Sequence, residues 1–162
     1  MMMSLSSLLW AHALVMGLQF VEMVRGEDMA VTSTRHRIFT NRMRTFIKVH
    51  YAAWLAALIS VIALYEAMGS LWVVLAVGIG TWAGLLTLAM LMLSLWLRSY
   101  IPGMVSGIGF FALRVLLIRD HVGSGALQTS SFLIAILLGV LMAIGMLISV
   151  LLLHRREPGP SG

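Results

Sequence analysis

The sequence predicts an all-α protein, a polytopic bundle of transmembrane helices, from its composition and from the length of its apolar runs. Hydrophobic residues make up 60% of the 162 residues, charged residues make up 10%, and the mean hydropathy is +1.00. Soluble domains carry about a quarter charged residues. The bilayer is therefore the expected solvent, and the apolar runs have the length of about 20 residues that a spanning helix needs.

Five apolar runs are expected to cross the membrane within a single transmembrane domain over residues 1–162. The first run lacks a basic start and a small-residue cleavage pattern, so we expect a retained helix rather than a signal peptide. A basic loop over 25–46 follows it, and a short break at 68–70 separates the second run from the third. The predicted spans are about 5–24, 47–67, 71–97, 102–118 and 129–153.

The later runs differ in length. The third run is long enough to tilt in the bilayer, whereas the fourth is short. Pro102 opens the fourth run, and a proline is tolerated in the first turn of a helix because it lacks an N–H. A polar turn at 119–128 leads to the fifth run, and a polar, irregular tail over 154–162 follows.

The basic residues predict the orientation. In a five-span topology nine of the eleven Lys and Arg residues fall on one side, Arg119 falls on the other, and Arg114 lies within a span. Because positive charge collects on the cytoplasmic side, we expect the N-terminus outside and the C-terminus in the cytoplasm of a bacterial cell. A four-span topology is the alternative, and it places Arg155 and Arg156 outside.

Two basic segments are expected to meet lipid or a partner. Arg98 and Tyr100 follow the third run and are expected at the cytoplasmic interface, where Arg snorkels and Tyr anchors among headgroups. The basic loop is expected to contact anionic headgroups, with the acidic surface of a partner protein as the alternative. Its closely spaced arginines are Arg35, Arg37, Arg42 and Arg44.

Small residues recur at a spacing of four on three of the predicted helices. Such spacing lets helix backbones approach closely in lipid, and packing within the bundle is the first interpretation. Docking to a partner subunit is the alternative. The glycines concerned are Gly80 and Gly84, Gly103 and Gly107, and Gly139 in a repeat with Ser131, Ala135 and Ala143.

Ionisable and amide side chains inside spans are costly and need partners. Glu22 and His50 lie at similar predicted depth, so they are the candidate pair, although His50 also fits an interfacial position and Glu22 a hydrated one. His12 and Arg114 lie in the outer half, and Arg114 alternatively snorkels outward. Glu66 is expected to pair with Arg114 or Arg119, and Gln19 is a further polar residue within the first span.

The motifs of common catalytic and metal sites do not occur. The chain has no cysteine, no H-x-x-H or H-E-x-x-H zinc motif, no G-x-S-x-G and no Walker loop. We therefore expect no metal, no cofactor and no nucleic-acid partner. His12 and His50 lie in opposite halves of the bilayer, which argues against a haem held by both, while a pigment held by a single His stays open.

The chain resembles the HXXEE-domain small polytopic membrane proteins. The likeness rests on "LQFVEM" at the end of the first span, on a loop rich in Thr, Ser and Arg, and on "LRSYIPGMVSG" after the third span. By this resemblance the family's His corresponds to Gln19, and its two Glu positions correspond to Glu22 and Met23. The family's polar residues on the third helix correspond to positions near Leu86 and Met90. The resemblance therefore implies a degenerate member whose polar site is largely lost, because Leu, Met and Gln cannot replace a His base or ligand.

Three functions follow from these observations. The first is a non-catalytic accessory or structural subunit, which packs with other membrane protein subunits in a larger complex; this interpretation disfavours an enzyme. The alternative is a small membrane-embedded enzyme or lipid-binding protein that uses Glu22 and His50. The third is a small transporter or pigment-binding subunit, although no internal repeat or pair of broken helices supports a transporter.

Overall fold

Every regular element in the described part of the chain is helical, which confirms the all-α class. The computed structural model describes residues 3–30, 41–69, 71–97, 101–124 and 127–155. The helices are α1 (Leu5–Ala30), α2 (Asn41–Met68), α3 (Leu71–Leu97), α4 (Met104–Leu117) and α5 (Thr129–Arg155). A single π-helical turn, η1 (Ile118–Val122), continues α4.

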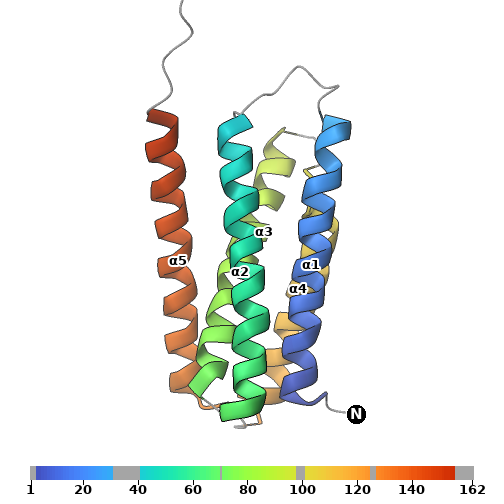
Figure 1. The fold of residues 1–162 in the computed structure, drawn as a ribbon. Coiled ribbons are helices and arrows are strands. Elements are labelled where there is room, and N and C mark those ends of the chain that lie inside the picture. Colours follow the sequence, from blue (N-terminus) through green and yellow to red (C-terminus); the bar gives the residue numbers. More distant parts are fainter. Residues whose placement is uncertain (1–2, 31–40, 70, 98–100, 125–126, 156–162) are drawn as a thin grey trace, which may run out of the picture.

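The helices run antiparallel to one another in chain order (Figure 1). We call the end where α1, α3 and α5 finish the upper end, and the end where they begin the lower end. The described chain starts at the lower end and finishes at the upper end (Figure 1), as five successive antiparallel helices require. Among the described residues, four helices are long and apolar enough to cross a membrane: α1, α2, α3 and α5. The fifth crossing, by the 14-residue α4, stays a prediction.

The basic loop is shorter than the sequence predicts, because helix extends into both of its ends. α1 continues to Ala30, and α2 already begins at Asn41. The polar turn also proves partly helical, since η1 occupies its first residues. Polar residues near a membrane surface can stay helical because water or headgroups solvate their side chains while the backbone bonds remain intact.

Two glycines with a positive φ close the tight connections. Gly69 has φ +96°, follows the last residue of α2, and donates its N–H to the carbonyl of Tyr65 at 3.0 Å, as a glycine does at a helix C-terminus. Gly103 also has φ +96° and is the N-cap of α4. Pro102 therefore lies in the turn ahead of α4, not in the first turn of the helix where the sequence placed it.

α3 lies at the centre of the bundle and α5 at its edge. The largest fully buried side chains include Trp82 of α3, Tyr51 of α2 and Phe110 of α4. α5 packs along α3 and leaves most of its apolar surface exposed, as expected of a helix that faces lipid or another subunit. Its separation from α1 is visible in Figure 1.

Candidate functional site

The centre of the described bundle is a polar cluster around the amide of Gln19, which is fully buried. Its Oε1 accepts a hydrogen bond of 2.6 Å from the hydroxyl of Tyr51. Its Nε2 donates to Oγ1 of Thr87 at 2.8 Å and to the carbonyl of Gly103 at 3.1 Å. Thr87 in turn donates to the carbonyl of Ala83 at 3.0 Å. One side chain thereby joins α1 to α2, α3 and the turn before α4.

Small residues make room for this cluster. A Cβ on Gly107 would lie 2.2 Å from Cγ2 of Thr87, and one on Gly103 would lie 3.3 Å from Cγ of Gln19. A Cβ on Gly26 would lie 2.2 Å from Cγ of Pro102. Because no larger residue fits without a shift, these glycines let α1, α3 and α4 come close enough for the Gln19 bonds to form.

Glu22 lies one helical turn above Gln19 and holds the start of α4. Its Oε2 accepts a hydrogen bond of 2.7 Å from the hydroxyl of Ser106 and one of 3.2 Å from the Ser106 N–H. The free N–H groups at a helix N-terminus favour an acidic partner. Glu22 of α1 therefore stabilises the first turn of α4, besides a further interaction that it makes.

His50 belongs to a group of aromatic rings on α2 and α3. Its Nε2 accepts a hydrogen bond of 3.0 Å from Nε1 of Trp54, so the proton of a neutral His50 sits on Nδ1. The rings of Trp54 and Trp82 lie 6.1 Å from the His50 ring, and Phe46 stacks on it at 5.4 Å. Glu22 and His50, the pair that the sequence suggests, thus have different partners.

The sequence missed three members of the central region. Tyr51, Thr87 and Ser106 supply the hydroxyl groups that hold Gln19 and Glu22, yet a lone hydroxyl residue in a helix carries no distinctive motif. Only Tyr51 could have been suspected from the sequence, because it directly follows the candidate residue His50 on the predicted inner part of the second span. Thr87 and Ser106 become recognisable only once the helices are packed.

His12 and Arg114 lie against one side chain, Phe110. The His12 ring meets the Phe110 ring edge-on at 5.1 Å, and Cζ of Arg114 lies 5.8 Å from the centre of the same ring. Nδ1 of His12 is 2.7 Å from the carbonyl of Leu8, while its buried Nε2 has no hydrogen-bond partner in the described part. Nη2 of Arg114 donates to the carbonyl of Val77 at 2.7 Å and to Thr81 at 3.2 Å.

Glu66 pairs with neither arginine that the sequence suggested. Its Oε1 accepts hydrogen bonds from the hydroxyl of Ser6 and, at 2.8 Å, from Nε1 of Trp10. These bonds join the end of α2 to the start of α1 at the lower end of the bundle. The prediction failed because α1, not α4, lies beside this end of α2.

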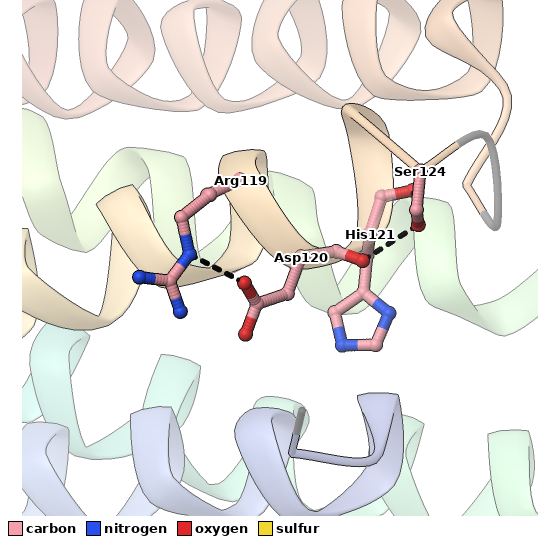
Figure 2. A network of polar contacts seen from close by, with 4 residues as sticks. All are labelled: Arg119, Asp120, His121 and Ser124. Carbon is pink, nitrogen blue, oxygen red and sulfur yellow. Dashed lines mark hydrogen bonds and ion pairs between the residues drawn. The ribbon is translucent and has the colours of Figure 1, made fainter. Parts of the chain in front are cut away.

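The π-turn η1 carries the second polar group at the lower end (Figure 2). Nε of Arg119 donates to Oδ1 of Asp120 at 2.6 Å, and the hydroxyl of Ser124 donates to the Asp120 carbonyl at 2.6 Å. The carboxylate of Asp120 and the ring of His121 lie on the same side of the turn (Figure 2). Both side chains are buried, although they belong to the polar turn that the sequence predicts over 119–128. The hydrogen bond from Arg119 lowers the pKa of Asp120.

The remaining glycines from the sequence analysis lie where α3 packs against α4 and against α5. A Cβ on Gly80 would lie 2.4 Å from Nη2 of Arg114, and one on Gly84 would touch the Phe110 ring at 3.7 Å. A Cβ on Gly139 of α5 would lie 2.5 Å from Cβ of Thr81 and 2.6 Å from the Gly78 carbonyl. These glycines pack within the bundle, which was the first interpretation of their spacing.

Some residues from the sequence analysis lie outside the described residues: Arg35, Arg37, Arg98 and Tyr100. The same holds for the side chain of Arg42, although its backbone belongs to α2, whereas Arg44 is described and partly buried at the start of that helix. Within the described ranges no three His, Asp or Glu side chains are placed to share a metal ion.

No family model matches the chain, and comparisons with curated proteins and with solved structures find no match either.

Proposed function

We propose that this protein is a non-catalytic accessory subunit of an integral membrane complex, in a bacterial cytoplasmic membrane. The observation that carries the proposal is the hydrogen bonding of Gln19. Its amide oxygen accepts a hydrogen bond from Tyr51, and its amide nitrogen donates to Thr87 and Gly103. A group that is fully buried and bonded to three other segments of the protein stabilises packing, and both of its N–H groups are already donated.

Glu22 supports the same proposal. A general base needs a carboxylate that meets its substrate, but the Glu22 carboxylate accepts two bonds from Ser106 and stabilises the start of α4. His50 likewise receives the Trp54 N–H on the ring nitrogen that would otherwise accept a proton. Both candidate catalytic groups therefore act as packing elements in this arrangement.

The resemblance to the HXXEE-domain proteins enters the proposal as well. A Cβ on Gly103 would lie 3.0 Å from Met23, 3.3 Å from Gln19 and 3.6 Å from Met90. These three side chains occupy positions where the resemblance places polar residues, and they gather around the Pro-Gly turn that carries the likeness. If a polar site has been lost, the residues at its positions still lie close together, as these three do. We therefore propose a degenerate relative of that family, in which Met23 and Met90 stand where the family has polar groups.

The outer surface of α5 supports a role in assembly. Along its length α5 exposes leucine and isoleucine side chains, among them Leu133, Leu137, Ile144 and Leu151. In the membrane this surface contacts lipid or the helices of another subunit. The alternative function, a lipid-binding protein or enzyme using Glu22 and His50, draws on the partial exposure of both side chains.

Native purification through a tag placed after Gly162 tests the proposal. The chain, extracted in mild detergent, is expected to carry a stoichiometric set of larger membrane subunits, identified by mass spectrometry. Deleting its gene is expected to reduce the amount of assembled complex while the remaining complex keeps its turnover per molecule. A chain that purifies as a partnerless monomer in every mild detergent contradicts the proposal, and a bound lipid lost on Glu22→Gln favours the alternative.

A further inference from the structure

Arg114 brings a permanent positive charge into the apolar helix α4. Arginine stays protonated even when buried, and charged groups inside a membrane normally pair with an opposite charge or with backbone carbonyls. Within the described residues Arg114 has no carboxylate partner; its contacts are the Val77 carbonyl, Thr81 and the Phe110 ring. The described acidic residues at the lower end are engaged elsewhere, Glu66 by Ser6 and Trp10, and Asp120 by Arg119.

One nitrogen of the guanidinium makes both of its hydrogen bonds, and the other two nitrogens make none within the described residues. Both hydrogen bonds come from Nη2, and this nitrogen lies only 2.4 Å from where a Cβ on residue Gly80 would stand. Nε and Nη1 have no partner in the described part of the chain, and they are not among its buried unpaired atoms. Since Arg114 is only partly buried, this edge of the guanidinium is left for a further partner.

The guanidinium is held at depth instead of snorkelling toward the lower end. Its bond partner Val77 lies six residues after the first residue of α3, which corresponds to about 9 Å along the helix. A lipid phosphate stays in the headgroup layer, outside the hydrocarbon core. A carboxylate carried on a transmembrane helix can reach this depth, because the helix brings it there.

The neighbouring surface of α4 suits such a helix. Ile108, Phe111 and Val115 of α4 and Ile118 at the start of η1 are exposed and recur at the spacing of one helical face, which Arg114 borders. An apolar stripe with one charge at its edge complements a helix that is apolar except for one acid. His12, the other titratable group at Phe110, supplies no negative charge.

We propose that Arg114 is the docking point for one Asp or Glu side chain on a transmembrane helix of a partner subunit, which packs on this stripe of α4. The proposal rests on the accessory function and adds the chemistry of the partner. It predicts that the partner carries its acid in the hydrocarbon core, at the level of Val77 on α3.

The test uses the full-length protein in phosphatidylcholine nanodiscs with a fluorescent polyleucine transmembrane peptide as the probe. The peptide carries a single Asp about one third of the way from one end, and a matched peptide carries Asn there. Energy transfer from a donor on the protein reports association. The Asp peptide is expected to bind roughly tenfold more tightly than the Asn peptide.

Three variants identify the residue responsible. Arg114→Gln is expected to abolish the preference for Asp, and Arg114→Lys to keep part of it because the charge remains. Arg119→Gln is the matched control, since Arg119 is exposed and already bonded to Asp120, and it is expected to leave the preference unchanged. Circular dichroism verifies that each variant is folded, and the lysine variant reports on charge even where the glutamine variant fails to fold.

Equal binding of the Asp and Asn peptides, or a preference that survives Arg114→Gln, overturns the proposal. So does displacement of the Asp peptide by phosphatidylglycerol that depends on Arg114, because the site then takes a lipid headgroup. The accessory function fails separately, through the absence of subunits in the native purification, which does not depend on Arg114. A complex that assembles equally well with Arg114→Gln leaves that function standing and refutes this docking point.

Discussion

The hydroxyl of Tyr51 on α2 donates a 2.6 Å hydrogen bond to Oε1 of Gln19 on α1, and both side chains are fully buried. In an apolar interior neither group has water as an alternative partner, so losing one leaves the other unpaired. This bond therefore sets the rotation of α1 relative to α2, and the same amide extends the constraint to α3 and α4.

Gln19→Leu is expected to lower the free energy of unfolding by about 2 kcal/mol, because the buried Tyr51 hydroxyl loses its acceptor. Denaturation in mild detergent, followed by tryptophan fluorescence, measures the change. Gln128→Leu is the matched control, since Gln128 is exposed. Removing both partners in Gln19→Leu/Tyr51→Phe should cost less than the sum of the single changes, and an additive result argues against the bond as the cause.

Gly107→Ala is expected to destabilise the bundle by about 1–3 kcal/mol. The new Cβ would lie 2.2 Å from Cγ2 of Thr87, and Thr87 cannot turn away without breaking its bonds to Gln19 and Ala83. Thermal unfolding in detergent checks this expectation. Gly145→Ala provides the comparison, because nothing lies within 4 Å of a Cβ at that position. Equal melting temperatures for the two variants would refute the packing argument.

Gly139→Ala is expected to move α5 away from α3. The added Cβ meets the Gly78 carbonyl at 2.6 Å, and a backbone atom cannot rotate out of the way as a side chain can. Spin labels on Leu75→Cys and Leu137→Cys, both at exposed positions, report the separation by pulsed electron resonance, and the absence of native cysteines keeps the labelling specific. The distance distribution should shift outward, whereas Gly145→Ala should leave it unchanged.

The stability of the lower end is expected to depend on pH through Asp120. The hydrogen bond from Arg119 lowers the pKa of this carboxyl in the folded protein. A lowered folded pKa means that ionised Asp120 contributes stability above the ordinary aspartate pKa of about 4, and that this contribution is lost as the pH falls through the lower, folded value. Melting temperatures of the wild type and of Asp120→Asn should therefore differ most at neutral pH and converge in acid.

Arg119→Gln serves as the second arm of that experiment. It removes the donor that lowers the Asp120 pKa, so it should remove much of the same pH-dependent stability while leaving the carboxyl in place. A melting-temperature difference between wild type and Asp120→Asn that stays constant from neutral to acidic pH would mean that ionisation of the carboxyl is not the source of the stability.

Much of the fold could be predicted because it depends on local properties of the chain. The apolar runs placed helices along most of 5–24, 47–67, 71–97 and 129–153, and the structure has helices over all four. Gly69 marks a helix end for a local reason, since only glycine adopts its positive φ without strain. The start of α4 was placed two residues early, because a proline fits a turn before a helix as readily as its first turn.

The partners of the polar side chains could not be predicted in the same way. Depth along the helices suggests that Glu22 faces His50 and that Glu66 faces Arg114 or Arg119. In the structure Glu22 instead bonds Ser106, His50 bonds Trp54, Glu66 bonds Ser6, and Arg114 bonds Val77. Depth fixes only one coordinate of a side chain. The other two depend on which helices are neighbours and on how each is rotated about its axis.

The sequence by itself determined the solvent and the secondary structure, because the number and spacing of apolar residues decide whether a chain enters a bilayer and where its backbone must be helical. Only the tertiary structure decided that Gln19, and not the Glu22 and His50 pair, lies at the centre of the polar contacts. The reason is the packing of glycines such as Gly103 and Gly107 against neighbouring helices, which sets the rotation of each helix and thereby the partner that each buried polar group finds.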